Sequence, residues 1–373
     1  MTARDAVEAV PVPMAMLAEL THRCPLKCPY CSNPIDLIRR SRELDAATWI
    51  DVFQQAARLG VLHVHLSGGE PVARADLEAL TEGARDAGLY TNLITSGVGL
   101  TRERLTQLAE IGLDHVQLSL QGADAASADE IGGHPGAFET KLQVAGWTTA
   151  LGLPLTVIAV THRRTLDRID DMIALAERLG ARRLEIAHVQ LHGWAARNRE
   201  ALTPTRAQVK RAGEAVRAAR ERLAGRMAID YVTPDLHASY PKACMGGWGR
   251  LGFCVTPEGK VLPCHAAETI PSLSFETVHD RPLAEIWADG PAFAAYRGVA
   301  WMPEPCASCD RRTRDWGGCR CQAFALTGDA GATDPVCSKS PLRAGVVDPL
   351  LADAEGADAT PPYVYRAYGP AGL

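Results

Sequence analysis

The sequence has no long apolar run and no strong excess of charge, and its number of cysteines is odd. No apolar stretch approaches the 18 residues of a membrane span, and the opening MTARDAVEAV lacks the charged-then-apolar pattern of a signal peptide. A net charge of −5 suggests no polyanion-binding surface, so we expect neither a membrane nor a nucleic-acid partner. We predict a cytoplasmic protein, whose 373 residues are enough for one large domain and a smaller one.

The middle of the chain lacks cysteine altogether. Of the 11 cysteines, three lie between Cys24 and Cys31, and the others lie between Cys244 and Cys337. An odd number of cysteines in a reducing compartment fits poorly with a closed set of disulfides. We therefore expect metal or redox chemistry at two separate places in the sequence.

The cysteine-free middle has a repeated strand–helix pattern. Six β-rich apolar runs predict strands at Met16–Leu20, Leu62–Leu66, Tyr90–Thr95, His115–Leu120, Leu155–Val160 and Leu184–Val189. Helices are predicted at Asp45–Leu59, Ala75–Ala87, Thr101–Ile111, Ala137–Leu151, Leu166–Leu179 and Thr203–Ala224. Because consecutive βα units build a parallel sheet, we predict an α/β fold with a partial, open (β/α)6 barrel. A doubly wound sheet is the alternative.

The first cysteine motif follows the first predicted strand. In THRCPLKCPYC, the residues Cys24, Cys28 and Cys31 have the spacing Cys-x3-Cys-x2-Cys. Three thiolates bind three irons of a [4Fe–4S] cube and leave the fourth iron open for a substrate or cosubstrate. A structural zinc site is the alternative, and it needs a fourth ligand such as His22 to complete a tetrahedron.

This spacing, with the aromatic Tyr30 before the last cysteine, resembles the signature of radical S-adenosylmethionine (SAM) enzymes. A second feature of that family follows the second strand, where SGGEP contains Gly68, Gly69 and Glu70. The resemblance implies a six-stranded partial barrel in which SAM chelates the open iron. Glycines let the backbone approach a ligand closely, and the Glu70 carboxylate can accept a hydrogen bond from the SAM amine.

Two further sets of polar residues follow later strands. By analogy with the family, Ser119 and Gln121 are candidate contacts to the SAM ribose or carboxylate, or else polar residues that simply end a strand. Trp194 and Asn198 follow the sixth strand. Both are candidates to face the substrate, and core packing is the alternative for Trp194.

Beyond about residue 235 the strand–helix pattern ends and the chain becomes rich in glycine, proline and cysteine. We predict a barrel domain over 1–235, a cysteine-rich domain over 236–345 and a tail over 346–373. A zinc ribbon is one interpretation of Cys306-x2-Cys309, but eight cysteines exceed one tetrahedral site.

The order of these cysteines resembles the SPASM domain, an appendage of radical SAM enzymes that houses two auxiliary clusters of the [2Fe–2S] or [4Fe–4S] type. The resemblance implies a first auxiliary cluster bound by Cys244, Cys264, Cys319 and Cys321. It implies a second bound by Cys306, Cys309, Cys337 and Asp315, an aspartate where the pattern has cysteine. Cys254 is then left over, and we expect it to be a small buried apolar residue.

The segments CPLKCPYCSNP, SGGEP and VQLHGWAARNREALTPTR are similar to the PqqA peptide cyclases of pyrroloquinoline quinone biosynthesis. This resemblance implies that a SAM-derived radical takes hydrogen from the γ carbon of a glutamate in the PqqA precursor peptide. That carbon then bonds to a tyrosine ring of the same peptide, and an auxiliary cluster accepts the electron released. A PqqD-like peptide chaperone and a flavodoxin-type reductant are the implied partners.

Two other functions remain open on the sequence. Another SPASM peptide-modifying enzyme, such as an anaerobic sulfatase-maturing enzyme, would share both cysteine regions. A non-catalytic iron–sulfur electron carrier would share the cysteines but would not need the GGE turn, and it would not cleave SAM.

Overall fold

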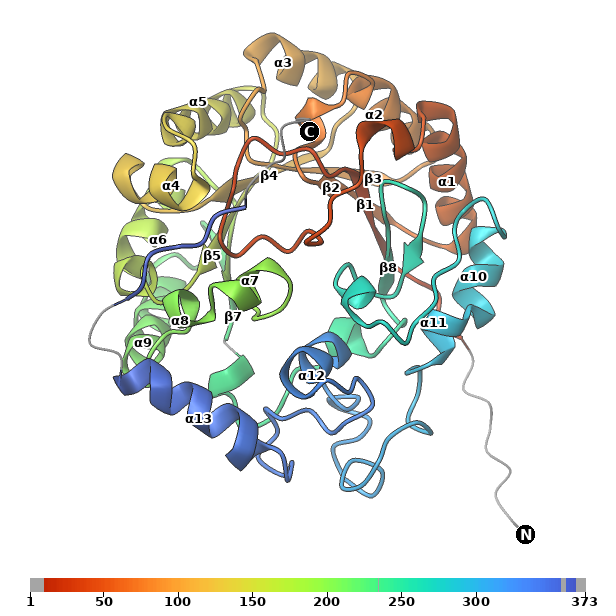
Figure 1. Cartoon of the computed structure of the whole chain (residues 1–373). Coiled ribbons are helices and arrows are strands. Elements are labelled where there is room, and N and C mark those ends of the chain that lie inside the picture. Colours follow the sequence, from red (N-terminus) through yellow and green to blue (C-terminus); the bar gives the residue numbers. More distant parts are fainter. Residues whose placement is uncertain (1–9, 234, 357–359, 367–373) are drawn as a thin grey trace.

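The computed structural model describes residues 10–233, 235–356 and 360–366. Its centre is a nine-stranded sheet in the order β7-β6-β5-β4-β3-β2-β1-β8-β9. The six predicted strands are present as β1 (Ala15–Thr21), β2 (His63–Gly68), β3 (Tyr90–Thr95), β4 (His115–Leu120), β5 (Leu155–Thr161) and β6 (Arg183–His188). Each pairs in parallel with the next, and the sheet curves into an open barrel (Figure 1), which confirms the predicted fold.

The sheet is longer at both edges than the sequence pattern predicts. At one edge β7 (Ala228–Val232) pairs in parallel with β6. At the other edge β8 (Gly252–Val255) pairs in parallel with β1, and β9 (Val261–Leu262) pairs antiparallel with β8. Because β8 and β9 come from the cysteine-rich half, the two halves of the chain share one sheet.

Helices cover the outer face of the barrel. The predicted helices are α1 (Ala46–Leu59), α2 (Leu77–Asp86), α3 (Arg102–Ile111), α5 (Ala137–Ala150), α6 (Ile169–Arg178) and α9 (Arg206–Arg222). The Asp45 side chain accepts a hydrogen bond from Thr48 N at 2.9 Å, and Gly60 has a φ of 103°, so α1 has the N-cap and C-cap expected for it. No helix in the described ranges is long and apolar enough to cross a membrane.

The remaining helices are shorter or lie in the second half of the chain. They are α4 (Ala125–Gly132), α7 (Trp194–Arg197), α8 (Arg199–Leu202), α10 (Leu283–Asp289), α11 (Pro291–Ala294), α12 (Arg320–Thr327) and α13 (Arg343–Gly356). Short 3-10 helices lie at Arg40–Arg42, Pro71–Ala73, Leu166–Arg168, Asp235–His237, Cys244–Gly246 and Ala267–Thr269. The helices α12 and α13 lie on the side of the barrel that the strands leave open (Figure 1).

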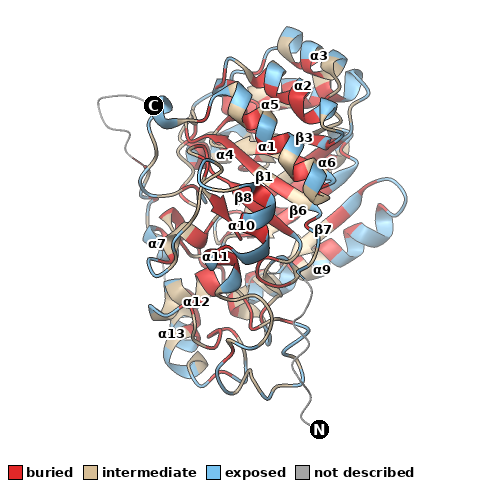
Figure 2. Ribbon diagram, turned by 90° about the vertical axis from the view of Figure 1, so that its right-hand side faces the viewer, coloured by how far each residue is buried: buried red, intermediate tan, exposed pale blue. Residues whose placement is uncertain are grey.

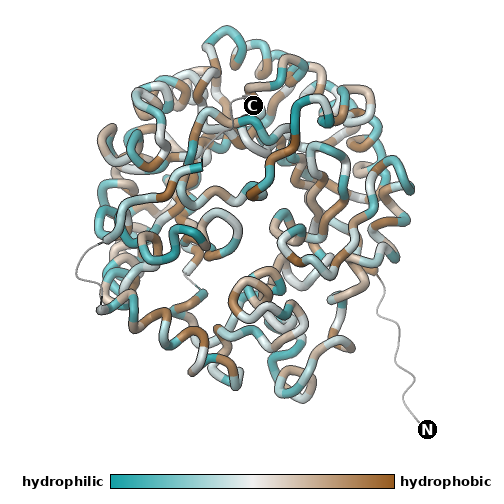
Figure 3. Tube along the Cα trace, in the orientation of Figure 1, coloured by the Kyte–Doolittle hydropathy of each residue, from teal (hydrophilic) through white to brown (hydrophobic). Residues whose placement is uncertain are grey.

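The main apolar core fills the space between the sheet and its helices. Figure 2 shows buried strands inside the exposed outer faces of the helices, and Figure 3 shows hydrophobic and hydrophilic stretches alternating along the chain. Trp49 and Phe53 of α1 are fully buried, with ring centroids 5.8 Å apart. Replacing either by alanine is expected to cost about 3–5 kcal/mol. A smaller core around Trp248 contains Cys254, which is buried as predicted.

Candidate active site

The loop after β1 carries the first cysteine motif across the mouth of the barrel (Figure 1). Within a turn of this loop, Cys31 N donates a hydrogen bond to Cys28 O at 3.1 Å, and Lys27 N donates to Gly132 O of α4 at 2.7 Å. We call residues 22–39 the cluster loop. Its three cysteines are all partly buried.

The electrostatics of the cluster loop suit a bound cation. Burial raises the pKa of the Cys28 thiol to about 12, and it also raises the pKa values of Cys24 and Cys31. Thiolates are therefore costly here unless a cation compensates their charge, and bound iron would do so. His22, the fourth ligand of the zinc alternative, is buried, and its Nδ1 accepts from Ile38 N at 3.2 Å.

The two glycines after β2 let that strand pack against the cluster loop. A Cβ on Gly68 would lie 2.4 Å from Thr21 O, and one on Gly69 would lie 2.3 Å from Arg23 O. Gly69 N donates to Thr21 O at 2.6 Å, and Glu70 N donates to Arg23 O at 2.7 Å. The two glycines thus allow two segments of the protein to approach each other closely, at the place where SAM is expected to bind.

The Glu70 side chain is buried in a network at the end of β3. Its carboxylate accepts from Thr95 Oγ1 at 2.7 Å, from Ser96 N at 2.7 Å and from Ser96 Oγ, as well as from Val72 N at 3.2 Å. Glu70 therefore orders the β3 loop. Its contact with the SAM amine stays a prediction.

Lys141 is a buried cation beside this network that the sequence analysis missed. It is fully buried on α5, and its Nζ donates to Ser96 O at 2.7 Å. Burial lowers its pKa, while the charges of Cys28 and Glu70 oppose that shift. The feature of the sequence that could have revealed this burial is a lysine within the mostly apolar face of a helix that packs on the barrel.

The predicted SAM contact Gln121 lies just beyond β4 and is 5% exposed. Its side chain is a hydrogen-bond partner of the Tyr30 side chain: burial raises the pKa of Tyr30, and the bond with Gln121 opposes that rise. Ser119 is partly buried within β4. The contacts of Tyr30, Ser119 and Gln121 with SAM stay predictions.

The four cysteines of the first auxiliary set lie together. Hydrogen bonds among their thiols lower the pKa values of Cys264 and Cys319 and raise those of Cys244 and Cys321. Cys319 is the N-cap of α12, where its Sγ accepts from Gln322 N at 3.4 Å. Four thiols in mutual contact are the soft donor set that iron–sulfur clusters and zinc both use.

The second auxiliary set lines one small cavity, in which the structure brings together Cys306, Cys309, Asp315 and Cys337. Asp315 is 8% exposed, and its Oδ2 accepts from Arg311 Nε at 3.1 Å, while its Oδ1 accepts from Gly317 N at 3.3 Å. In the described parts of the chain, no group of three His, Cys, Asp or Glu side chains is arranged to hold a single metal ion. The side chains of each predicted set are grouped and have the donor atoms that iron–sulfur clusters use. They are not arranged around one point, as the ligands of a single metal ion would be.

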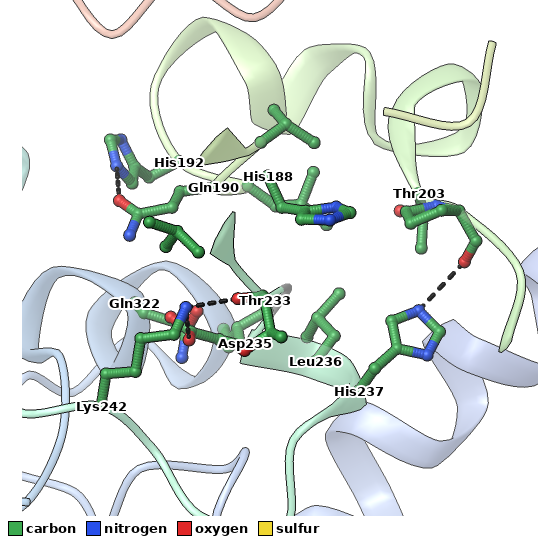
Figure 4. Close-up of a pocket in the computed structure, with 15 residues that line it drawn as sticks. His188, Gln190, His192, Thr203, Thr233, Asp235, Leu236, His237, Lys242 and Gln322 are labelled. Carbon is green, nitrogen blue, oxygen red and sulfur yellow. Dashed lines mark hydrogen bonds and ion pairs between the residues drawn. The ribbon is translucent and has the colours of Figure 1, made fainter. Parts of the chain in front are cut away.

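A further pocket joins the barrel to the cysteine-rich half. It lies between the ends of β6 and β7 and helix α12 (Figure 4). Its cavity volume is about 30 Å³. His188 and His192 line one side, and Asp235 and Lys242 form an ion pair of 2.9 Å on the other. Burial lowers the pKa of His188 to about 3, so its ring is neutral. The sequence analysis did not identify this pocket.

Trp194 packs in the interior, which was the alternative interpretation for this residue, and Asn198 is buried beside it. They are 6% and 3% exposed. Asn198 Nδ2 donates to Pro29 O of the cluster loop at 3.0 Å.

Comparison with known proteins places this arrangement in a family. The model of the radical SAM superfamily matches residues 18–176, and that of the SPASM iron-sulfur cluster-binding domain matches residues 244–310. The chain is 59% identical over 367 residues to a PqqA peptide cyclase of Methylorubrum extorquens strain PA1, covering 98% of this chain and 95% of that one. The chain belongs to the PqqA peptide cyclase family. It is also 62% identical over 342 residues to the PqqA peptide cyclase of Rhizobium meliloti strain 1021, covering 92% of this chain and 91% of the relative.

Solved structures share the fold of this family member at low sequence identity. Streptococcus suis SuiB bound to S-adenosylmethionine has a TM-score of 0.74 and 18% identity, covering 88% of this chain and 78% of its own. Native anSMEcpe with bound AdoMet has a TM-score of 0.61 and 15% identity, covering 92% and 96%. These likenesses bear on the fold alone. The cyclase relatives do not favour the alternative of a sulfatase-maturing enzyme.

Proposed function

We propose that this protein is a radical SAM oxidoreductase that forms a carbon–carbon bond within the PqqA precursor peptide. The bond joins the γ carbon of a glutamate to a tyrosine ring, as an early step of pyrroloquinoline quinone biosynthesis. The observation that carries the proposal is the identity of 59% to 62% to PqqA peptide cyclases over nearly the whole chain.

We assign the ligand sets as follows. The SAM cluster is bound by Cys24, Cys28 and Cys31, the first auxiliary cluster by Cys244, Cys264, Cys319 and Cys321, and the second by Cys306, Cys309, Asp315 and Cys337. The auxiliary clusters are of the [2Fe–2S] or [4Fe–4S] type. SAM is contacted by Tyr30, Gly68, Gly69, Glu70, Ser119 and Gln121.

When bound, the reduced SAM cluster and SAM together supply a 5′-deoxyadenosyl radical. The chain's own residues hold the site in shape for it. Glu70 fixes the β3 loop through Thr95 and Ser96, and Lys141 fixes the same loop from α5. Cys319 and Cys321 of the first auxiliary set lie at the start of α12, and Gln322 and Leu326 of the same helix line the pocket of Figure 4. That pocket therefore lies between the barrel and these two cysteines.

The division into a barrel over 1–235, a SPASM domain over 236–345 and a tail over 346–373 belongs to the same proposal. So do a PqqD-like chaperone that presents the peptide, a flavodoxin-type electron donor and a cytoplasmic location. The pairing of β8 with β1 means that the first two domains would be joined through a common sheet.

Incubating the reconstituted protein with SAM, a strong reductant and PqqA-type peptide tests this function. We expect 5′-deoxyadenosine to form and the peptide to lose two hydrogen atoms. An electron carrier would release no 5′-deoxyadenosine, and that result would refute the proposal. A peptide with its reacting glutamate replaced by alanine is the matched control, and it should stay uncross-linked.

A further inference from the structure

Arg320 is a fully buried arginine in the cysteine-rich half of the chain. It is the first residue of α12, and in the sequence it lies directly between Cys319 and Cys321 of the first auxiliary set. Only 1% of its surface is exposed. Because burying a charged group is costly unless the charge is paired, this side chain needs negative charge nearby.

The guanidinium of Arg320 is bonded to three backbone carbonyls. Its Nη1 donates to Ala330 O at 2.9 Å and to Ala332 O at 2.7 Å, and its Nη2 donates to Gly317 O. Its Nε has no hydrogen-bond partner among the described residues. Carbonyl dipoles fix the orientation of the guanidinium, but they carry no net charge and so do not neutralise it.

Charges from both auxiliary sets act on Arg320. Burial lowers the pKa of its guanidinium, and the negative charges around it oppose that shift. These charges belong to Asp334, Cys319, Cys306 and Cys244. Gly317, whose carbonyl accepts from Arg320, also lines the cavity of the second set. The buried cation therefore lies next to the first set and beside the cavity of the second.

The carboxylate among these groups, Asp334, is bonded to backbone donors. It is 1% exposed, its Oδ2 accepts from Cys319 N at 3.0 Å, and its Oδ1 accepts from Val336 N at 3.0 Å. Asp334 therefore holds the start of α12 in place. Four anionic ligands exceed the positive charge of an oxidised [2Fe–2S] or [4Fe–4S] core, so each auxiliary cluster would be a net anion beside Arg320.

We propose that Arg320 is the shared counter-charge of the two auxiliary clusters and raises the reduction potential of both. Reduction makes a cluster more negative, and a fixed positive charge nearby favours that change. Trp301 covers the guanidinium with its ring centroid 4.5 Å away, and a charge in the interior is screened little by solvent. The inference rests on the proposed function only in taking both cysteine sets as cluster sites. A wild-type protein without auxiliary clusters would contradict both, whereas unchanged potentials in a variant would contradict the inference alone.

The test compares Arg320→Gln with Arg320→Lys in the full-length, iron-reconstituted protein, by redox titration followed by EPR. We expect the potentials of both auxiliary signals to shift downward in Arg320→Gln, because the charge is lost. In Arg320→Lys the charge stays, so the shift should be clearly smaller although the three carbonyl bonds are disturbed. The SAM-cluster signal serves as the internal reference and should keep its potential in both variants.

Arg297 offers a matched control in the same half of the chain. Its guanidinium donates to Gly249 O at 3.1 Å, to Ala288 O at 3.0 Å and to Trp287 O at 2.8 Å, and it lies 5.0 Å from the Trp287 ring centroid. Burial and the charge of Arg250 lower its pKa, and no cysteine of the described residues contributes to that shift. Arg297→Gln therefore disturbs a similar set of bonds and should leave both auxiliary potentials unchanged.

Iron content supplies a second readout that is independent of turnover. Loss of the auxiliary clusters in Arg320→Gln but not in Arg320→Lys would also support the proposal, because the charge would then be needed for assembly. Wild-type potentials in Arg320→Gln would overturn it. An equal shift or an equal loss of iron in Arg320→Lys would overturn it too, since the carbonyl bonds and not the charge would be responsible. So would an equal shift in Arg297→Gln.

Discussion

At the scale of single residues, Asp315 is where this chain departs from the cysteine pattern of SPASM domains. Its carboxylate lines the cavity that contains Cys306, Cys309 and Cys337, and Arg311 and Gly317 hold it there. A carboxylate oxygen is a harder ligand than a thiolate, and ligand identity is one determinant of the potential of an iron–sulfur cluster. As a ligand, Asp315 would thus distinguish the proposed second auxiliary cluster from the proposed first one.

We predict that Asp315→Cys keeps this cluster but changes its EPR signal and reduction potential, and slows peptide cross-linking more than SAM cleavage. Asp315→Ala should disturb the same signal. The exposed Asp289, which pairs with Arg281 at 2.7 Å and does not line this cavity, provides the control Asp289→Ala, with no spectral change expected. Wild-type spectra and full cross-linking in both Asp315 variants would mean that Asp315 is not a ligand.

Glu70 gives a second test at a single residue. Glu70→Gln places an amide NH2 group where the carboxylate now accepts from Val72, Thr95 and Ser96, so at least one donor loses its acceptor. We expect a loss of about 1–3 kcal/mol in unfolding free energy and SAM binding weaker by roughly 1.5–3 kcal/mol. Denaturant titration and SAM equilibrium dialysis measure the two effects. Unchanged SAM affinity would remove Glu70 from the site.

At the scale of elements, the end of β6 carries a pH-dependent contribution to stability. Burial lowers the folded-state pKa of His188 to about 3, below the value of about 6.5 in unfolded chains. The unfolded chain therefore binds the extra proton between these values. The contribution of His188 is complete above about pH 6.5 and is lost as the pH falls, by at most about 1.4 kcal/mol per pH unit.

We expect His188→Gln to reduce this dependence, because glutamine does not titrate and can still bond Tyr231 OH, which lies 3.0 Å from His188 Nε2. Urea unfolding of both proteins at about pH 7.5 and about pH 5.5 compares the two slopes. Equal slopes in the wild type and the variant would show that His188 does not contribute in this way.

Regular elements could be predicted from the sequence where local signals agree. The bounds of β3 and β4 match the prediction because each β-rich run begins shortly after a glycine of positive φ, Gly88 or Gly112, that follows the preceding helix. Strands β8 and β9 were missed because they have only four and two residues, and because β8 pairs with β1, which is far away in the sequence. Pairing of that kind leaves no periodicity in the sequence.

The candidate site, too, could be predicted from the sequence only in part. The resemblance to SPASM domains implied two auxiliary ligand sets, and the structure groups the side chains of each set. Their binding of clusters stays a prediction. Other features depend on tertiary packing. These are the partners of Glu70, the burial of Lys141 and the course of residues 360–366. A single sequence does not encode such contacts in any local pattern.

At the scale of the whole molecule, the predicted ligand sets lie in separate parts of the fold. The cluster loop follows β1 at the barrel mouth, whereas the auxiliary sets lie in residues 244–337, beyond β7. We predict that replacing Cys24, Cys28 and Cys31 together by alanine abolishes SAM cleavage while the auxiliary clusters persist. Iron analysis and EPR check this, and loss of all iron would show that the partition is wrong.

The central claim is that the chain couples SAM cleavage to a glutamate–tyrosine bond in PqqA. Tandem mass spectrometry of the peptide after reaction with SAM and reductant tests it most directly. We predict a product lighter by two hydrogen atoms, with fragments missing between one glutamate and one tyrosine and present elsewhere. Release of 5′-deoxyadenosine with a peptide of unchanged mass, or a cross-link between other residues, would contradict the claim.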